Sequence, residues 1–273
     1  MVSTRSQSYS TEGIVVRAVD LGEADRLLTI LTPFHGTVRA VAKGARRPGS
    51  KLGGHLDLLR HVSLSVREGR SLDTVSQAET VSGFRGLHDD LGRLSLGLYL
   101  AELAERFSVE GAANPQLFRL LNAALTELEA VQDGGLLARW FEARLLLMSG
   151  FAPEVGRCVE CGKQLEQRDH VFSAPASGIL CPACRPSAGE GTLLPAPVST
   201  VKLLRFLLRS DWPAVCRLRT DPDELRRVER IHADHLHYVL DRALRSAAFV
   251  DEVRSGAAAG PRRHSQPDMQ ADT

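Results

Sequence analysis

Apolar and polar residues alternate in five short runs along residues 11–79, a period that is typical of strands with one buried face. Turn-forming glycine and proline residues separate several of these runs. Five antiparallel strands of this length predict a small barrel, and the OB-fold is a barrel of this kind that commonly binds nucleic acid. The period alone also fits an SH3-like barrel. The runs are Ile14 to Ala18, Leu28 to Ile30, Val38 to Ala42, Val62 to Val66 and Thr74 to Ser76.

After residue 84 the apolar residues recur with the period of a helix. The first helix, from Leu87, is apolar over most of its circumference, which predicts a central position in a bundle. A second helix begins at Asn114 and Pro115, a side-chain cap followed by proline at the first helical position. A third ends at Gly150. The helical pattern returns over residues 199–210 and again after residues 221–224, which have the order of a capping box.

Two Cys-x-x-Cys pairs lie between the helical segments, with nineteen residues separating them. Each pair can place two thiolates on one tetrahedral ion, and residues 172–178 match the hairpin of a zinc ribbon. We therefore predict one structural zinc ion. Four thiolates would fill its coordination sphere, which disfavours a catalytic metal, and the lack of a βαβ pattern disfavours a thioredoxin-like redox site. The four predicted ligands are Cys158, Cys161, Cys181 and Cys184.

Composition and pattern together predict an α+β protein with three parts. The chain has 273 residues, 43% of them hydrophobic and 25% charged, which is typical of a soluble globular protein. We expect an OB-fold nucleic-acid-binding domain at 1–82, a helical domain at 83–250 with a zinc finger at 155–190, and a disordered tail at 251–273. No apolar run approaches the ~20 residues that cross a bilayer, and residues 1–10 do not resemble a signal peptide, so we expect a cytoplasmic protein without a membrane partner.

Charge is distributed unevenly along the chain. Residues 26–60 contain seven basic residues and one acid, Asp57, whereas residues 85–150 contain six basic and nine acidic residues. A run of charge is usually a solvated face. Here the basic residues cluster on one strand and on the glycine- and proline-broken loop after it, where backbone can approach a phosphate chain closely. This arrangement favours the nucleic-acid backbone as a partner.

The candidate DNA-binding residues are Arg26, Arg39, Lys43, Arg46, Arg47 and Lys51. Phosphate contacts from such residues give affinity through counterion release and do not depend on base sequence. Neutralising two backbones on one patch also removes their mutual repulsion, which favours annealing of complementary strands. Tyr9, Phe34 and Phe84 are the aromatic residues before position 85, so we expect electrostatics to outweigh base stacking.

Several short motifs occur between residues 10 and 249. They are Thr-Glu-Gly-Ile-Val at 11–15, Gly-Glu-Ala-Asp-Arg at 22–26, Leu-Thr-Pro at 31–33, Val-Ala-Lys-Gly-Ala-Arg-Arg at 41–47, and Gly-Phe-Ala-Pro at 150–153 leading into the first cysteine pair. Together they resemble the RecO family of bacterial DNA repair proteins. The polar C-terminal tail and residues 55–61 depart from the family pattern.

The resemblance implies a cytoplasmic, nucleoid-associated recombination mediator of the RecFOR pathway, without enzyme activity or a small-molecule substrate. Its partners would be single- and double-stranded DNA, RecR and single-strand DNA-binding protein. It would anneal complementary strands and, with RecR, assist RecA loading onto DNA coated by single-strand DNA-binding protein. A general RNA-binding protein with an OB-fold and a zinc ribbon fits the fold and charge equally well.

Side chains outside the barrel carry further expectations. We expect the helical domain to bind the acidic tail of single-strand DNA-binding protein, either at Arg139 to Phe141 with Arg144 or at Arg226, Arg227 and Arg230. The simpler interpretation is that these arginines pair with Glu142 or Glu229. His232 and His235 share a helix face and are more typical of core or surface residues than of metal ligands. Cys216 is predicted to be a small buried residue.

Overall fold

The N-terminal part of the chain forms a closed five-stranded barrel. The computed structural model describes residues 7–132, 134–185, 191–240, 249–250 and 252–253. The strands are β1 (Ser8–Leu21), β2 (Asp25–Leu31), β3 (Thr37–Ala42), β4 (His61–Arg67) and β5 (Asp73–Ser82). Their order is β1-β2-β3-β5-β4, with β1 and β4 closing the barrel, and only β3 and β5 pair in parallel. All five predicted strands are confirmed, and this strand order supports the OB-fold rather than the SH3-like alternative.

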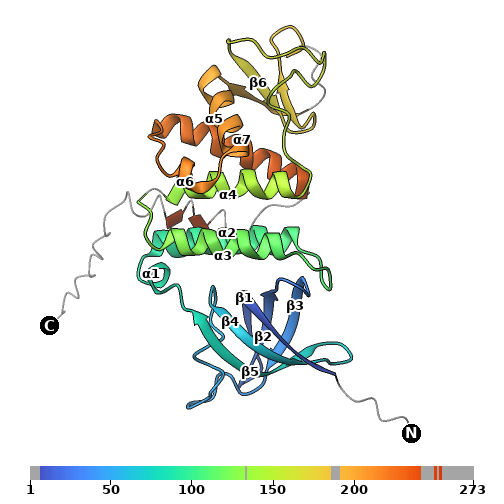
Figure 1. Ribbon diagram of the computed structural model, residues 1–273, viewed down its shortest axis with the longest axis vertical. Coiled ribbons are helices and arrows are strands. Elements are labelled where there is room, and N and C mark those ends of the chain that lie inside the picture. Colours follow the sequence, from blue (N-terminus) through green and yellow to red (C-terminus); the bar gives the residue numbers. More distant parts are fainter. Residues whose placement is uncertain (1–6, 133, 186–190, 241–248, 251, 254–273) are drawn as a thin grey trace, which may run out of the picture.

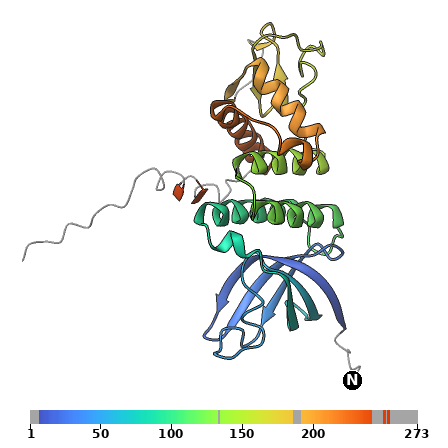
Figure 2. The same ribbon diagram turned by 60° about the vertical axis from the view of Figure 1, so that its left-hand side comes forward.

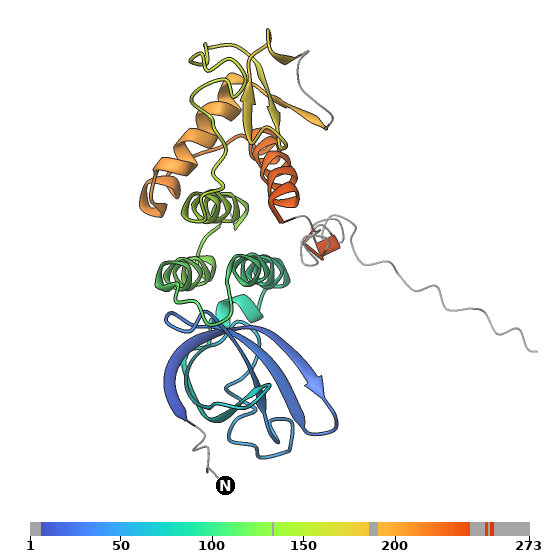
Figure 3. The same cartoon turned by 90° about the vertical axis from the view of Figure 1, so that its right-hand side faces the viewer.

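Helices lie in layers above the barrel. They are α1 (Arg85–His88), α2 (Leu91–Phe107), α3 (Pro115–Leu128), α4 (Gly134–Met148), α5 (Val198–Arg209), α6 (Trp212–Val215) and α7 (Pro222–Leu240). Figure 1 shows α2 and α3 directly above the barrel, then α4, then α5 to α7. The end-on view of Figure 3 shows α2 and α3 between the barrel and α4, so the predicted central position of α2 is confirmed. The predicted cap of α3 is also present, because the Asn114 side chain accepts the Leu117 N–H at 3.0 Å.

A small antiparallel sheet lies at the end of the molecule opposite the barrel (Figures 1 and 2). It contains β6 (His170–Ser173), β7 (Gly178–Leu180) and β8 (Leu193–Ala196) in the order β7-β6-β8. The β6–β7 pair is the hairpin expected between the two cysteine pairs. Among the described residues, no helix combines the length and the apolar character that crossing a membrane requires.

The first strand contributes to two hydrophobic cores. Val15 packs inside the barrel, whereas its neighbours Ile14 and Val16 belong to the core formed with the helices. The register of β1 against β2 shifts between Val15 and Arg17, and such a bulge changes the direction in which the following side chains point. Leu31 and Leu59 also join the helical core. The barrel and the helical layers therefore share buried apolar surface.

Backbone hydrogen bonds join the β2–β3 turn to the loop between α2 and α3. The Gly111 N–H donates to the His35 carbonyl at 3.1 Å, and the Asn114 N–H donates to the Pro33 carbonyl at 3.0 Å. Gly36 has a φ of +60°, and a Cβ added there would lie 2.1 Å from the Val109 carbonyl oxygen. Glycine is required at this position for its left-handed conformation and for the close approach of the two backbones.

Two expectations differ from the structure. Cys216 is exposed, so its predicted burial is wrong. Asp221 caps α7 by accepting the Asp223 N–H at 2.9 Å, but Glu224 binds the Ser199 and Thr200 hydroxyls at the start of α5 instead of completing the capping box. Of the predicted tail, only residues 252 and 253 are described, and they are helical. The remaining tail positions lie outside the described residues.

Candidate nucleic-acid interface and metal centre

The basic loop, residues 43–60, connects β3 to β4 and is fixed against the β1–β2 turn. The Gly44 N–H donates to Asp25 Oδ1 at 2.8 Å, and the Arg46 N–H donates to the Ala24 carbonyl at 2.9 Å. Gly44 has a φ of +64°, which allows the chain to turn sharply after β3. These bonds hold the start of the loop, and with it the predicted basic cluster, at one rim of the barrel.

Two of the predicted DNA-binding residues are engaged in ion pairs within the protein. Arg26 pairs with Asp20 at 3.5 Å and with Asp57 at 3.0 Å. Arg46 also pairs with Asp20, at 3.3 Å, and donates to the Gly22 carbonyl at 3.1 Å. The charge count over residues 26–60 missed Asp20 because it precedes that window in sequence and reaches the loop only through the β1–β2 turn. Arg26 and Arg46 therefore help to shape the rim as well as adding charge.

The other four predicted residues are more accessible to a ligand. Arg39 lies on β3, and Lys43, Arg47 and Lys51 lie in the basic loop; all four are exposed. Within the described part of the chain, no acidic side chain lies within ion-pair distance of any of them. We call these four residues the open basic set. Exposed cations without an internal partner keep their full charge for a phosphate chain.

Aromatic side chains contribute to the barrel surface in a way that the sequence did not indicate. Phe84 is buried, Phe34 is 66% exposed, and the ring of Tyr9 lies 4.4 Å from the ring of His35. The residues that form this ring pair come from the start of β1 and from the β2–β3 turn. Tyr9 and His35 are 26 positions apart in the chain, so their proximity is visible only in the folded barrel.

The four predicted metal ligands come together beside the β6–β7 hairpin. Their sulfur atoms all lie within 4.8 Å of one another, and Cys161 Sγ lies 3.9 Å from Cys181 Sγ. Sulfur atoms bound at about 2.3 Å to one tetrahedral zinc ion lie roughly 3.8 Å apart, so the spacing fits such an ion. Gly162, with a φ of +70°, closes the first turn by donating its N–H to the Cys158 carbonyl at 2.9 Å.

The electrostatics of the cysteine cluster also favour a cation. Burial raises the pKa of the Cys158 thiol, but backbone N–H groups of Cys161, Cys181 and Glu160 outweigh burial and lower that pKa to about 6. A side-chain hydrogen bond with Cys181, together with burial and the remaining cysteines, raises the pKa of Cys184 to about 12. Four thiolates this close repel one another, so they ionise together only when a bound cation compensates their charge.

Arg139, predicted as part of a docking surface, is buried in the centre of the helical layers. It is 4% exposed, and its guanidinium lies 2.6 Å from Glu142 and 3.0 Å from Glu229. The pairing that we named as the simpler interpretation is therefore confirmed for Arg139, which also lines the cavity described next. Arg144 donates to the Leu208 carbonyl at 3.3 Å.

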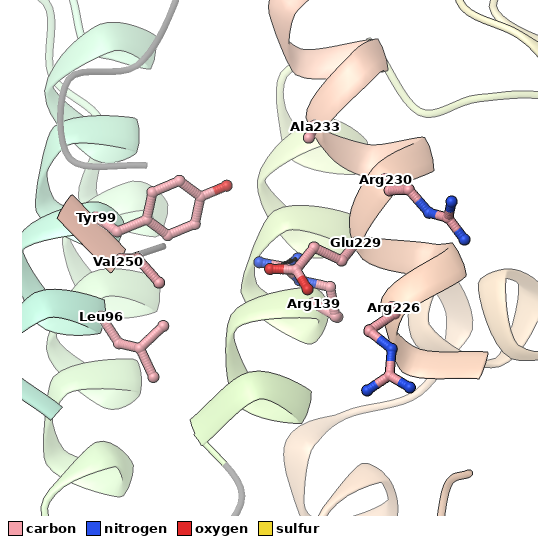
Figure 4. Close-up of a pocket in the computed structure, with 8 residues that line it drawn as sticks. All are labelled: Leu96, Tyr99, Arg139, Arg226, Glu229, Arg230, Ala233 and Val250. Atoms are coloured by element: carbon pink, nitrogen blue, oxygen red, sulfur yellow. Dashed lines mark ion pairs between the residues drawn. The ribbon is translucent and has the colours of Figure 1, made fainter. Parts of the chain in front are cut away.

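The second predicted docking surface does border a cavity. Arg226 and Arg230 line a space of about 520 Å³ between α2 and α7. Figure 4 shows Tyr99 and Val250 on one side of this space, and Arg226, Glu229 and Arg230 on the other. Apolar walls with cations at the rim suit a ligand that is partly hydrophobic and partly anionic. Arg227 lies outside this lining and pairs with Glu224 at 3.2 Å.

His232 and His235 of α7 are core residues with specific partners. Each is 1% exposed. His232 Nδ1 lies 2.8 Å from Glu142 Oε2, and His235 Nε2 donates to the Phe151 carbonyl oxygen at 2.8 Å. Their burial bears out the core alternative of the prediction. Their partners lie 90 and 84 residues away in the chain, which explains why sequence inspection did not find them.

Comparison with known proteins gives matches along most of the chain. Residues 6–84 match the family model described as Recombination protein O N terminal, and residues 88–248 match Recombination protein O C terminal. A DNA repair protein RecO from Dehalococcoides mccartyi is 34% identical over 251 residues, which is 92% of this chain and 98% of the relative. A RecO from Roseiflexus sp. is 39% identical over 251 residues, covering 92% and 87% of the two chains. A third, from Nocardioides sp., is 38% identical over 250 residues, covering 89% and 99%.

Proposed function

This chain belongs to the RecO family of DNA repair proteins, and from that premise we propose that it is a non-enzymatic recombination mediator. It binds single- and double-stranded DNA, anneals complementary strands and, with RecR, assists RecA loading onto DNA coated by single-strand DNA-binding protein. Its place of action is the cytoplasm, at the nucleoid. The observation that carries the proposal is the match to both halves of the family, together with a barrel whose β3–β4 loop carries exposed cations.

The open basic set supports binding to DNA of any sequence. Arg39, Lys43, Arg47 and Lys51 present charge at the end of β3 and in the loop that follows. Contacts of this type neutralise phosphates and release counterions, and they leave the base edges free to pair. Two strands held by the same cations repel each other less, which is the physical basis of the proposed annealing activity. The paired residues Arg26 and Arg46 have a lesser share in binding.

The test is a salt titration of DNA binding and annealing. We expect Arg47→Ala with Lys51→Ala to lower the slope of log affinity against log salt by roughly 0.7 to 0.9 for each phosphate that is no longer neutralised, with the same effect on different sequences. The matched control is Lys202→Ala with Arg217→Ala, which removes two exposed charges from the helical layers. An unchanged slope in the loop variant contradicts the proposal. Running the assay with RNA strands separates it from the RNA-binding alternative, which predicts equal or tighter binding of RNA.

We also propose that the metal centre holds one structural zinc ion. Cys158, Cys161, Cys181 and Cys184 would supply all four ligands, so the ion would stabilise the fold of residues 154–185 and leave no open position for a substrate. The close sulfur atoms and the N–H groups directed at Cys158 support this assignment. The proposed ion lies at the opposite end of the molecule from the basic loop (Figure 1), which suits a structural role and not contact with the same DNA.

The acidic tail of single-strand DNA-binding protein is proposed to bind in the cavity beside Arg226 and Arg230. Its apolar walls and the exposed Arg226 and Arg230 support this choice; Arg139 lines the same cavity, but it is buried and already pairs with Glu142 and Glu229. A fluorescent tail peptide tests it: reversing the charges of Arg226 and Arg230 should weaken peptide binding, while Arg47→Glu should leave it unchanged. Loss of peptide binding with Arg47→Glu alone would place the peptide on the barrel instead.

A further inference from the structure

A second cavity lies on the barrel, beside the start of β3 and away from the basic loop. Its volume is about 400 Å³, which is within the range of small-molecule sites. It is lined by the Tyr9 and His35 rings, residues 37–39 of β3, the β4–β5 hairpin from Glu68 to Asp73, and residues 110 and 111 of the α2–α3 loop. Four segments that are distant in sequence thus meet around one space.

The aromatic wall of this cavity is held in place by the protein. The Tyr9 hydroxyl donates to Asp73 Oδ2 at 3.2 Å, and Asp73 Oδ1 accepts the Gly69 N–H at 3.1 Å. Burial and the Asp73 carboxylate raise the pKa of Tyr9 to about 12, so its hydroxyl keeps the donated proton at neutral pH. The His35 backbone N–H donates to Thr32 Oγ1 at 3.1 Å, which holds the turn that carries the His35 ring. The Tyr9 ring is therefore anchored, and the His35 ring packs against it with 4.4 Å between the ring centres.

The charges around this cavity argue against a phosphate ligand. Arg39 and Arg70 contribute two positive charges, but Glu68, Asp73 and Glu110 contribute three negative ones. Carboxylates repel phosphate and accept hydrogen bonds from N–H groups. A planar neutral ligand with N–H donors is the best fit to such a cavity. Unpaired nucleobases have this character, and they stack on aromatic side chains in single-strand binding proteins.

We propose that this cavity binds one unpaired base of a single strand whose phosphates lie along Arg39 and the basic loop. The Tyr9 and His35 rings provide the stacking surface, and Glu68 accepts from the exocyclic amino group of the base. Adenine, cytosine and guanine carry such a group and thymine does not, so the cavity discriminates against thymine. Arg39 and Lys43 are about 13 Å apart along β3, so one strand can reach both regions. This inference rests on the proposed DNA-binding function.

The test compares the affinities of the full chain for oligo(dC) and oligo(dT) of equal length. Both affinities are measured by fluorescence anisotropy at neutral pH and at several salt concentrations. We expect the affinity for oligo(dC) to exceed that for oligo(dT) by roughly fivefold or more, because both bases can stack but only cytosine can donate the additional hydrogen bond to the Glu68 carboxylate. Tyr9→Ala should remove this preference and leave the salt slope unchanged. Tyr9→Phe, which keeps the ring, should retain most of it.

A second variant separates base recognition from an effect on folding. Glu68 is exposed, so Glu68→Gln should leave the barrel intact and still reduce the preference for oligo(dC). The matched control is Tyr238→Ala, which removes a tyrosine that is 52% exposed on α7 and should change neither affinity. Equal binding of the two oligonucleotides by the unmodified protein, or a preference that survives both Tyr9→Ala and Glu68→Gln, overturns the base site alone. Failure of every oligonucleotide to bind overturns the proposed function as well.

Discussion

Replacing Glu142 by glutamine should destabilise the protein more than any exposed charge substitution. Glu142 is fully buried, and one carboxylate oxygen accepts from the Tyr99 hydroxyl and from Arg139, each at 2.6 Å. The other oxygen lies 2.8 Å from His232 Nδ1. Burial raises the pKa of Glu142, but Arg139, His232 and Tyr99 outweigh burial and lower it, so the carboxylate is ionised at neutral pH. One charged side chain thus joins α2, α4 and α7.

The expected cost follows from the charge that the substitution leaves behind. Glutamine can still accept a hydrogen bond from Tyr99 or Arg139, but it carries no charge to balance the buried Arg139 guanidinium. Arg139 would then pair with Glu229 alone, at 3.0 Å. Removing one partner of a buried ion pair typically costs about 3 to 5 kcal/mol. That is a large part of the roughly 5 to 15 kcal/mol that stabilises a typical native protein.

Urea unfolding followed by tryptophan fluorescence measures this cost directly. Trp140 and Trp212, whose rings are 5.6 Å apart, report on the packing of α4 against α6. The matched control is Asp223→Asn, which breaks an exposed pair with Arg226 and should cost less than about 1 kcal/mol. If Glu142→Gln costs no more than this control, the buried network does not stabilise the fold and our reasoning about it is wrong.

Three further predictions concern other parts of the molecule. Cys158→Ser should remove the bound ion, measured by elemental analysis, and lower the melting temperature, whereas Cys216→Ser should do neither. Unmodified protein that is folded but contains no metal would contradict the zinc assignment. Burial lowers the pKa of His235 despite its hydrogen bond to Phe151, so its contribution to stability is complete above the unfolded pKa of about 6.5 and is lost as pH falls below it. His235→Gln should flatten the unfolding free energy between about pH 7 and 5, and an unchanged pH profile would exclude this role. Gly22→Ala, at an open position with a φ of +59°, should lower the free energy of unfolding by about 1 kcal/mol. Gly36→Ala should lower it several times more, because the added Cβ meets the Val109 carbonyl oxygen. Equal melting temperatures of the two variants would contradict this.

Local features of the chain were predictable from the sequence. The strands followed from alternation, the α3 cap from Asn114 and Pro115, and the cysteine cluster from the spacing of Cys158, Cys161, Cys181 and Cys184. Each depends on residues close together in the chain, or on a ligand pattern with few alternatives. The family resemblance rested on short motifs of the same kind, and the family match confirms it.

Features that depend on tertiary contacts were not predictable in the same way. The pairing of Asp20 with Arg46 joins residues from different elements, so a count of charges in a sequence window did not reveal it. The Tyr9 and His35 rings meet only because β1 and the β2–β3 turn converge. Alternation also could not show that Ile14 and Val16 pack against helices while Val15 packs inside the barrel.

The shared core limits how this protein can be dissected in the laboratory. A truncated chain ending near residue 84 would retain all five strands but would expose Ile14, Val16, Leu31 and Leu59 to water, since their packing partners lie on the helices. At about 1.5 to 3 kcal/mol for each side chain, the missing burial amounts to roughly 6 to 12 kcal/mol. An excised barrel would therefore be unstable or would self-associate through that face. DNA binding measured on such a fragment would report on its aggregation as much as on its loop, and the intact chain is the suitable material for mapping the interface.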